Sequence, residues 1–175
     1  MTTNDITDII IQSMADRQFS AFLTTYSRQC IDEADVFGVN KGGYMYEYEV
    51  KRSRSDFHAE FRNKKAKHRK LEKRDPLRRY NKWINGRRTD DMDEFIQIPN
   101  RYYFACPEGL ILPDEVPVYA GLIYVSEEGE YQEIKKAPLL HRVKANQQIY
   151  EGIANVLSQR IIYGCSYYTY KHNKS

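Results

Sequence analysis

Two short stretches separated by a glycine pair constrain the fold of this chain most. Residues 31–40 and 44–51 are rich in β-branched and aromatic side chains, and Gly42 and Gly43 lie between them. Two such runs joined by a few residues that include glycine are typical of a β-hairpin. A hairpin fixes which side chains of its two strands share a face, because side chains alternate along each strand.

This alternation places three charged groups together. Glu49 and Lys51 are two residues apart and are expected on one face, and the hairpin brings Asp35 alongside them. Carboxylate oxygens suit Mg²⁺ or Mn²⁺ rather than Zn²⁺. A divalent cation at such a pair would lower the pKa of its water and neutralise charge developing on a phosphate. The alternative interpretation is that Glu49 and Lys51 form an ion pair on the strand surface.

Further segments follow these three residues in a recognisable order. Glu49-Val50-Lys51 is followed by Ser53 and then by Asp56-Phe57, and strand-like stretches follow at 99–111 and 119–125. Together with Asp35, this order resembles the PD-(D/E)XK nuclease superfamily, in particular its small phage and bacterial members. The similarity covers roughly residues 30–142. The chain departs from the family pattern in that no proline precedes Asp35.

The resemblance implies a site and an activity. Asp35, Glu49 and Lys51 would be the catalytic residues, and the cation, Mg²⁺ or Mn²⁺, would be held by Asp35, Glu49 and the carbonyl of Val50. Lys51 would orient the attacking water or stabilise the transition state. Many members of the superfamily add an acid from the first helix, and either Asp8 or Asp16 could fill that place.

The remaining pattern predicts helices on both sides of a central sheet. Apolar residues recur at helical spacing from residue 5 to 24, which predicts one helix or two pieces, capped by Asn4 or Asp5. A second helix is expected from Ser55 or Asp56 to about residue 71. The other expected elements are strands at 31–39, 44–52, 101–106 and 119–125, a short helix near 77–84, and a last helix over 145–162 with a buried stripe of Ile149, Ile153, Val156, Leu157 and Ile161. This order predicts an α/β fold with a restriction-endonuclease-like core, a central mixed β-sheet flanked by helices.

Positive charge is concentrated in one segment. Residues 62–88 contain thirteen Lys and Arg but only two acidic residues, although the net charge of the whole chain is +3. Such a block indicates either a polyanion partner or a solvated helix face. On the first interpretation, the phosphate contacts come from this block and from the residues just before it. The candidate nucleic-acid-binding residues are Arg52, Arg54, Lys64, Lys65, Lys67, Arg69 and Lys70.

The chain length of 175 residues predicts a single domain over residues 1–175, with a basic helical insertion at about 62–94 and a frayed tail at about 170–175. Cys30, Cys106 and Cys165 form no metal-binding or disulfide pattern, which fits a reducing cytoplasm, bacterial or of a phage-infected host. We expect no membrane contact and no signal peptide. Neither a phosphate-binding glycine loop nor a serine-hydrolase motif is present.

Two functions from different classes fit these observations. The first is a metal-dependent nuclease that acts on DNA, with RNA as a further possible substrate. The second is a catalytically inactive nucleic-acid-binding or virion protein that uses the same fold. Asp56 is expected to be a helix cap rather than a site residue, and His141 a structural histidine. The sequence leaves open endo- or exonuclease action, specificity and oligomeric state, a dimer included.

Overall fold

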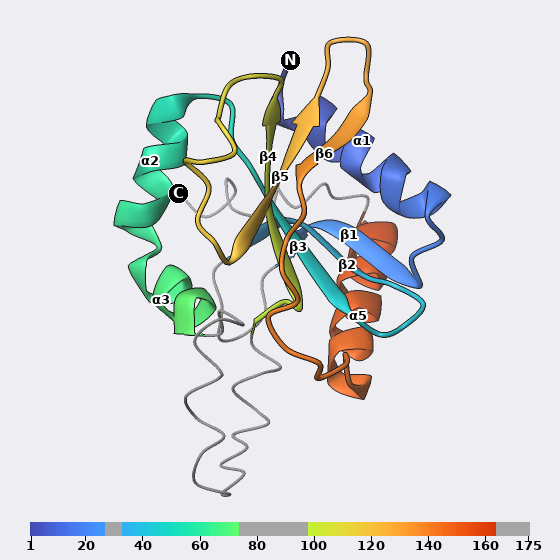
Figure 1. The fold of residues 1–175 in the computed structure, drawn as a ribbon. Helices are drawn as coiled ribbons and strands as arrows, with labels where there is room; N and C mark the ends of the chain where they lie inside the picture. Colours follow the sequence, from blue (N-terminus) through green and yellow to red (C-terminus); the bar gives the residue numbers. More distant parts are fainter. Residues whose placement is uncertain (27–32, 74–97, 164–175) are drawn as a thin grey trace, which may run out of the picture.

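A six-stranded mixed sheet forms the centre of the computed structural model, which describes residues 1–26, 33–73 and 98–163 (Figure 1). The strands lie side by side in chain order, from β1 to β6. The short helix expected near 77–84 lies outside the described residues. The strands are β1 (Ala21–Tyr26), β2 (Ala34–Val39), β3 (Met45–Val50), β4 (Arg101–Pro107), β5 (Ala120–Val125) and β6 (Tyr131–Lys135).

Strand direction changes within the sheet. β1, β2 and β3 pair antiparallel, β3, β4 and β5 pair parallel, and β6 returns antiparallel to β5. The parallel pairing of β3 with β4 requires a crossover connection, and this connection contains α2 (Arg54–Asn63) and α3 (Lys65–Lys73). The expected α/β fold with a central mixed sheet flanked by helices is confirmed.

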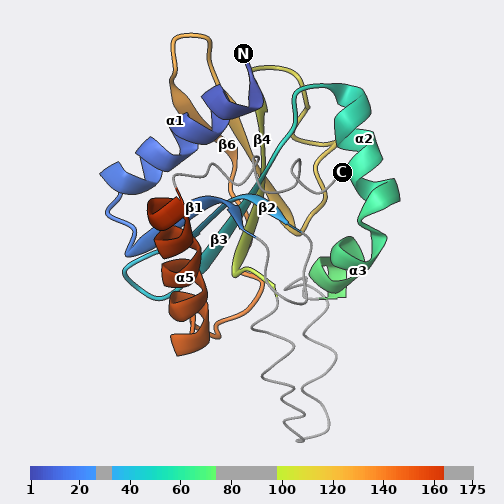
Figure 2. The same ribbon diagram turned by 180° about the vertical axis from the view of Figure 1, so that it is seen from behind.

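The helices cover both faces of the sheet. α1 (Thr3–Asp16) packs Ile6, Ile10 and Met14 against the face that carries Tyr48 and Val50. The opposite face packs against α2 and α3 over β4 and β5, through residues such as Phe57, Leu71, Tyr102 and Phe104. At the other end of that face, α5 (Gln147–Tyr163) covers Phe37, Val39 and Met45. Figures 1 and 2 show α2–α3 and α5 on opposite sides of the molecule, because they cover different ends of this one face of the sheet.

The first predicted helix is wrong in its second half. α1 ends at Asp16, Gln18 has a positive φ of 55°, and residues 21–26 form the edge strand β1. The physical reason is local, because residues 21–26 (Ala-Phe-Leu-Thr-Thr-Tyr) are mostly β-branched or aromatic. The backbone N–H of Ser20 donates to the carbonyl of Val39 at 2.8 Å, which starts the pairing.

Both predicted helix caps were placed too late in the sequence. The hydroxyl of Thr2 caps α1 by accepting from the N–H of Asp5, and the Asp5 carboxylate accepts from the N–H of Thr2 in return. The hydroxyl of Ser53 caps α2 by accepting from the N–H of Asp56. Asp56 is therefore a first-turn acid, which favours the positive end of the helix dipole but is not the cap.

The last helix packs through a different stripe from the expected one. Ile149 and Ile153 are buried and Val156 packs against them, but Leu157 is 38% exposed and Ile161 is 82% exposed. The contact face continues to Arg160, which donates to the hydroxyl of Thr24 at 3.2 Å. The stripe 149, 153, 156, 160 has regular helical spacing, and Leu157 and Ile161 lie roughly 70° and 110° from its centre, toward solvent. Strand β6 was not predicted.

Asn100, a fully buried residue just before β4, joins three parts of the chain. Its side-chain oxygen accepts from the N–H of Met45 at 2.6 Å, and its amide nitrogen donates to the carbonyls of His141 and Val143 at 2.9 and 2.8 Å. The ring of His141 is buried, with one nitrogen 3.1 Å from Asn100 and the other 3.1 Å from the carbonyl of Ile98. The prediction of a structural His141 is confirmed.

Within the described residues, no helix is both long enough and apolar enough to cross a membrane.

A substitution at Gly121 tests how closely β5 packs against the stretch that follows β6. A Cβ at this position would lie 2.4 Å from the Tyr103 ring and 2.6 Å from the backbone nitrogen of Ala137. We therefore expect Gly121→Ala to lower the free energy of unfolding by about 1–3 kcal/mol, as overpacking does. Urea denaturation measures this, with Gly42→Ala as the control, because a Cβ on the exposed Gly42 meets nothing closer than 3.3 Å. Equal stability of both variants would contradict the close approach.

Candidate active site

Asp35 and Glu49 lie on one face of the sheet. Val36 pairs with Tyr48 in the antiparallel register of β2 and β3, so the next pair along the ladder is Asp35 with Glu49. Directly opposed residues of an antiparallel pair point to the same face. The Oδ2 atom of Asp35 also accepts from the N–H of Val50 at 2.7 Å. The two carboxylates are therefore neighbours, as the sequence suggested.

The carboxylates of Asp35 and Glu49 repel one another. Glu49 is 1% exposed and Asp35 is half-buried. Burial, and then the charge of Glu49, raise the pKa of Asp35 to about 6, although the Val50 N–H and the nearby lysines act against the shift. The ionised form of Asp35 is therefore less stable at this position than in water.

Lys51 lies on the same face as Glu49 and is also buried, at 5% exposure. Its ammonium nitrogen is 2.8 Å from Oε2 of Glu60, on α2, and 3.6 Å from Oε2 of Glu49. Burial by itself would lower the pKa of Lys51, but Glu49 and Glu60 outweigh this effect and raise it. Lys51 is therefore a charged ammonium held between two carboxylates.

Two further lysines reach the same carboxylates from the helices. Lys67 is 4% exposed and lies 2.6 Å from Glu47, and it also contacts Oε1 of Glu49. Lys64 contacts the same Oε1 atom at 2.8 Å and keeps about a quarter of its side chain exposed. The two acids raise the pKa of Lys67 despite its burial.

The assignment of Lys67 to nucleic-acid binding is therefore wrong. Its ammonium is buried between Glu47 and Glu49 and is not exposed to a phosphate. The physical reason is that two buried glutamates on one strand require a counter-charge, and α3 supplies it. Lys64 points inward for the same reason, at the break between α2 and α3, where its φ of −109° and ψ of 39° leave the helical region.

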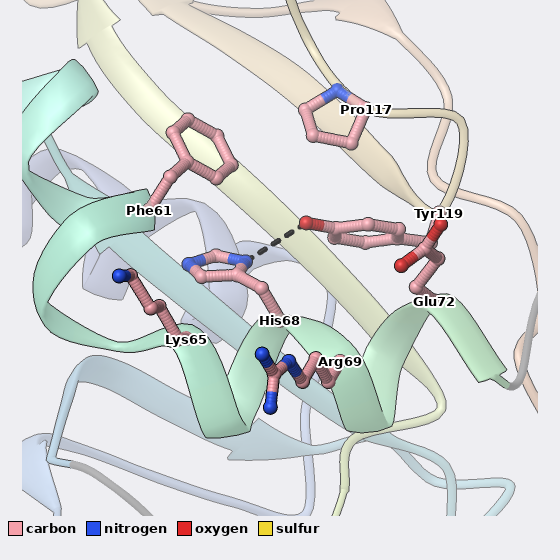
Figure 3. A pocket seen from close by; sticks show the side chains of 7 residues that line it. All are labelled: Phe61, Lys65, His68, Arg69, Glu72, Pro117 and Tyr119. Carbon is pink, nitrogen blue, oxygen red and sulfur yellow. Dashed lines mark hydrogen bonds between the residues drawn. The ribbon is translucent and has the colours of Figure 1, made fainter.

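The predicted cationic face exists on the outer side of these helices. Arg52, Arg62, Lys65 and Arg69 are exposed, whereas Lys70 is partly buried. Lys65 and Arg69 border an open hollow of about 300 Å³ together with Phe61, His68, Glu72, Pro117 and Tyr119 (Figure 3). Arg54 is exposed too, but both of its terminal nitrogens contact the Glu115 carboxylate, and one donates to the carbonyl of Leu110 at 3.1 Å.

The donor set fits a divalent cation in part. Asp35 and Glu49 supply hard oxygens, and a bound cation would stabilise the ionised form of Asp35, which burial and the charge of Glu49 disfavour. One oxygen of Glu49 already contacts two ammonium groups, which leaves its Oε2 and Asp35 as the oxygens for a metal. Within the described ranges, no group of three or more His, Cys, Asp or Glu side chains is arranged to hold a metal ion.

The first-helix acids do not complete this site. Asp8 and Asp16 are both exposed, and α1 packs on the face opposite to Glu49. The buried acids that do accompany the pair are Glu47 and Glu60, which the sequence interpretation missed. A signal for Glu60 was present, because positions 57, 60, 64, 67, 68 and 71 have the spacing of one helix face, and Phe57 and Leu71 on that face are apolar.

Comparison with known proteins supports the fold alone. No protein-family model matches the sequence, and no curated protein matches it. A solved structure of the SPO1766 protein of unknown function from Silicibacter pomeroyi is similar, with a TM-score of 0.59 and 15% sequence identity. The match covers 92% of this chain and 90% of that one.

The raised pKa of Asp35 predicts a pH effect on stability in the metal-free protein. Its folded-state pKa of about 6 exceeds the ordinary value of 3.8, so the folded state binds the proton more tightly than the unfolded state does. Ionisation of Asp35 should therefore lower stability as the pH rises through this window. Asp35→Asn should remove that loss, because asparagine does not ionise.

This effect is measured by urea denaturation between about pH 4 and pH 6.5. Asp114→Asn, at an exposed position, is the control and should leave the pH profile unchanged. A profile that Asp35→Asn leaves unaltered would show that folding does not raise the pKa of Asp35.

Lys65 and Lys67 are two residues apart on α3 and have opposite environments. Lys67→Ala leaves Glu47 and Glu49 buried without their shared partner, and we expect a loss of about 3–5 kcal/mol in the free energy of unfolding. Lys65→Ala, on the exposed side, should change it by less than about 0.5 kcal/mol. Denaturant unfolding of both variants tests this difference, and similar losses would mean that Lys67 is not buried between the acids.

Proposed function

We propose that this protein is a metal-dependent nuclease that hydrolyses phosphodiester bonds in DNA, with Asp35, Glu49 and Lys51 as its catalytic residues. One observation carries the proposal: the three groups lie on one face of β2 and β3, with Asp35 opposite Glu49 and Lys51 3.6 Å from Glu49. Two carboxylates next to an ammonium suit phosphodiester hydrolysis, because a cation and a lysine can both face the phosphate.

Asp35 and Glu49 would hold Mg²⁺ or Mn²⁺, with the carbonyl of Val50 as a further ligand. When bound, the cation would activate water and neutralise charge that develops on the phosphate. Lys51 carries a fixed positive charge beside this position, so it would stabilise the transition state without first having to be desolvated. The Val50 N–H holds the Asp35 carboxylate in place through its 2.7 Å hydrogen bond.

The DNA backbone would approach along the outer face of α3. Lys65 and Arg69 are four residues apart, so they share one face of the helix and border the same hollow (Figure 3). No carboxylate partner of either residue is found in the described part of the chain. Lys64, exposed by about a quarter, is the cation that joins this surface to Glu49. Lys70, on α3, would extend this surface. Arg52 precedes α2, within electrostatic range of Asp5, and would make a separate phosphate contact.

A specific observation also favours the second candidate, a catalytically inactive protein that binds nucleic acid on the same fold, in a virion or elsewhere. Lys64 and Lys67 both contact Oε1 of Glu49, so this acid is already neutralised without a metal. In that case the carboxylates would be structural and only the basic surface would act. The cellular setting proposed for either function is the cytoplasm of a bacterium or of a phage-infected cell.

Cleavage assays with linear, circular and branched DNA, and with RNA, with and without Mn²⁺, distinguish the two candidates. We expect Mn²⁺-dependent cleavage that Lys51→Ala lowers by about 10²–10³-fold, while DNA affinity stays the same, because Lys51 acts on the transition state. Lys41→Ala, an exposed lysine in the β2–β3 turn, is the matched control and should cleave normally. DNA binding without cleavage by the wild-type protein would favour the inactive candidate.

A further inference from the structure

Glu60 is a buried acid that the catalytic assignment does not use. It lies on α2, its side chain is 3% exposed, and it reaches across to β3. It is nine residues from Lys51 in the sequence, and its Oε2 atom accepts from the Lys51 ammonium at 2.8 Å. A carboxylate at this position binds the candidate catalytic lysine directly.

The two acids beside Lys51 are not equivalent. The ammonium nitrogen is 2.8 Å from Glu60 but 3.6 Å from Glu49, so its hydrogen bond goes to Glu60. Without Glu60, the remaining attraction would draw Lys51 toward Oε2 of Glu49. That atom is one of the oxygens proposed for the cation, and an ammonium in contact with it would compete with a metal for the same lone pairs.

The Glu60 carboxylate has two further charged or polar neighbours, one at the break between α2 and α3 and one on α3. Its Oε1 atom lies 3.4 Å from the Lys64 ammonium and 3.4 Å from Nε2 of His68. The other ring nitrogen of His68 is 2.8 Å from the hydroxyl of Tyr119, just before β5 (Figure 3). A series of contacts therefore runs from Tyr119 through His68 and Glu60 to Lys51.

A purely structural ion pair would not need this arrangement. Buried ion pairs stabilise proteins little, because desolvation offsets their attraction, and apolar residues of similar volume often replace them without loss. The contacts here instead fix the direction of one ammonium. Lys51 is held away from the carboxylate pair but within reach of it, which is what a group that acts on a bound phosphate needs.

We propose that Glu60 is a positioning residue, which holds the Lys51 ammonium away from Glu49. His68, whose other ring nitrogen contacts Tyr119, lies beside the second oxygen of this carboxylate. This inference rests on the proposed nuclease function. It predicts that a neutral side chain of the same shape at position 60 displaces Lys51 and impairs turnover without weakening substrate binding.

Glu60→Gln tests the inference through two measurements. The first is the ¹H–¹⁵N signal of the Lys51 ammonium at one fixed pH, assigned with Lys51→Arg, which reports the position of this group whether or not the protein cleaves DNA. The second is steady-state cleavage. We expect the Lys51 signal to shift or disappear and kcat to fall by about 10²-fold with KM unchanged, because the displacement is on the ångström scale.

Glu115→Gln is the matched control, because it removes one carboxylate from an exposed ion pair with Arg54. It should leave both the Lys51 signal and kcat unchanged. An unaltered Lys51 signal in Glu60→Gln would overturn the inference, and so would a fall in kcat that is equalled by Glu115→Gln.

If Glu60→Gln does not fold, the same two measurements on Glu60→Asp test the inference instead. Aspartate keeps the charge but withdraws it by one methylene, so the Lys51 signal should persist at a shifted position and kcat should fall less than expected for glutamine. An unshifted signal would overturn the inference. A wild-type protein that cleaves no substrate would instead contradict the proposed function, and the Lys51 signal would still report whether Glu60 positions this lysine.

Discussion

The burial of Glu47 and Glu49 on one face of β3 is the constraint on which the rest of the structure depends. Two carboxylates that are almost inaccessible to water are tolerated only with counter-charges in contact. Lys67 supplies one between them, and Lys64 and Lys51 supply two more. The crossover helices that carry Lys64 and Lys67 must therefore lie over β3, and their position on the sheet follows from charge as much as from apolar contact.

The two faces of β3 show how differently one strand can be covered. On one face Tyr48 and Val50 meet the apolar side of α1, and on the other Glu47, Glu49 and Lys51 meet charged groups of α2 and α3. Apolar packing tolerates small displacements of a helix, whereas paired charges at 2.6–2.8 Å do not. The charged face therefore fixes the geometry around Asp35 and Glu49.

The sequence was sufficient to place Asp35, Glu49 and Lys51 together, because strand alternation and a short hairpin leave little freedom. It could not show where the lysines of α2 and α3 point. Lysine is rarely buried, so a run of lysines predicts a solvated face, and only the two glutamates of β3 make burial of Lys67 favourable. The break at Lys64, which turns two lysines inward, has no signal as strong as proline or glycine.

The other errors arose where local pattern competes with tertiary contact. Phe22 and Leu23 continue the helical stripe of α1, but β-branched neighbours and pairing with β2 place them in a strand. Ile161 fits the apolar period of α5, but the sheet ends at its edge strand β1. Arg160, rather than Ile161, contacts that strand, through the hydroxyl of Thr24.

The hydrogen bonds of Asn100 limit where residues can be inserted into this chain. The stretch from Ala137 to Val143 contains neither helix nor strand, but it passes over Gly121 and is tied to β3 and β4 through the Asn100 side chain. Its backbone is therefore part of the interior, and an added residue there would break contacts with two strands at once. The turn at 126–130, between β5 and β6, lies at the surface and can lengthen without such a loss. Homologues of different length should accordingly differ at this turn, while the segment without secondary structure keeps its length.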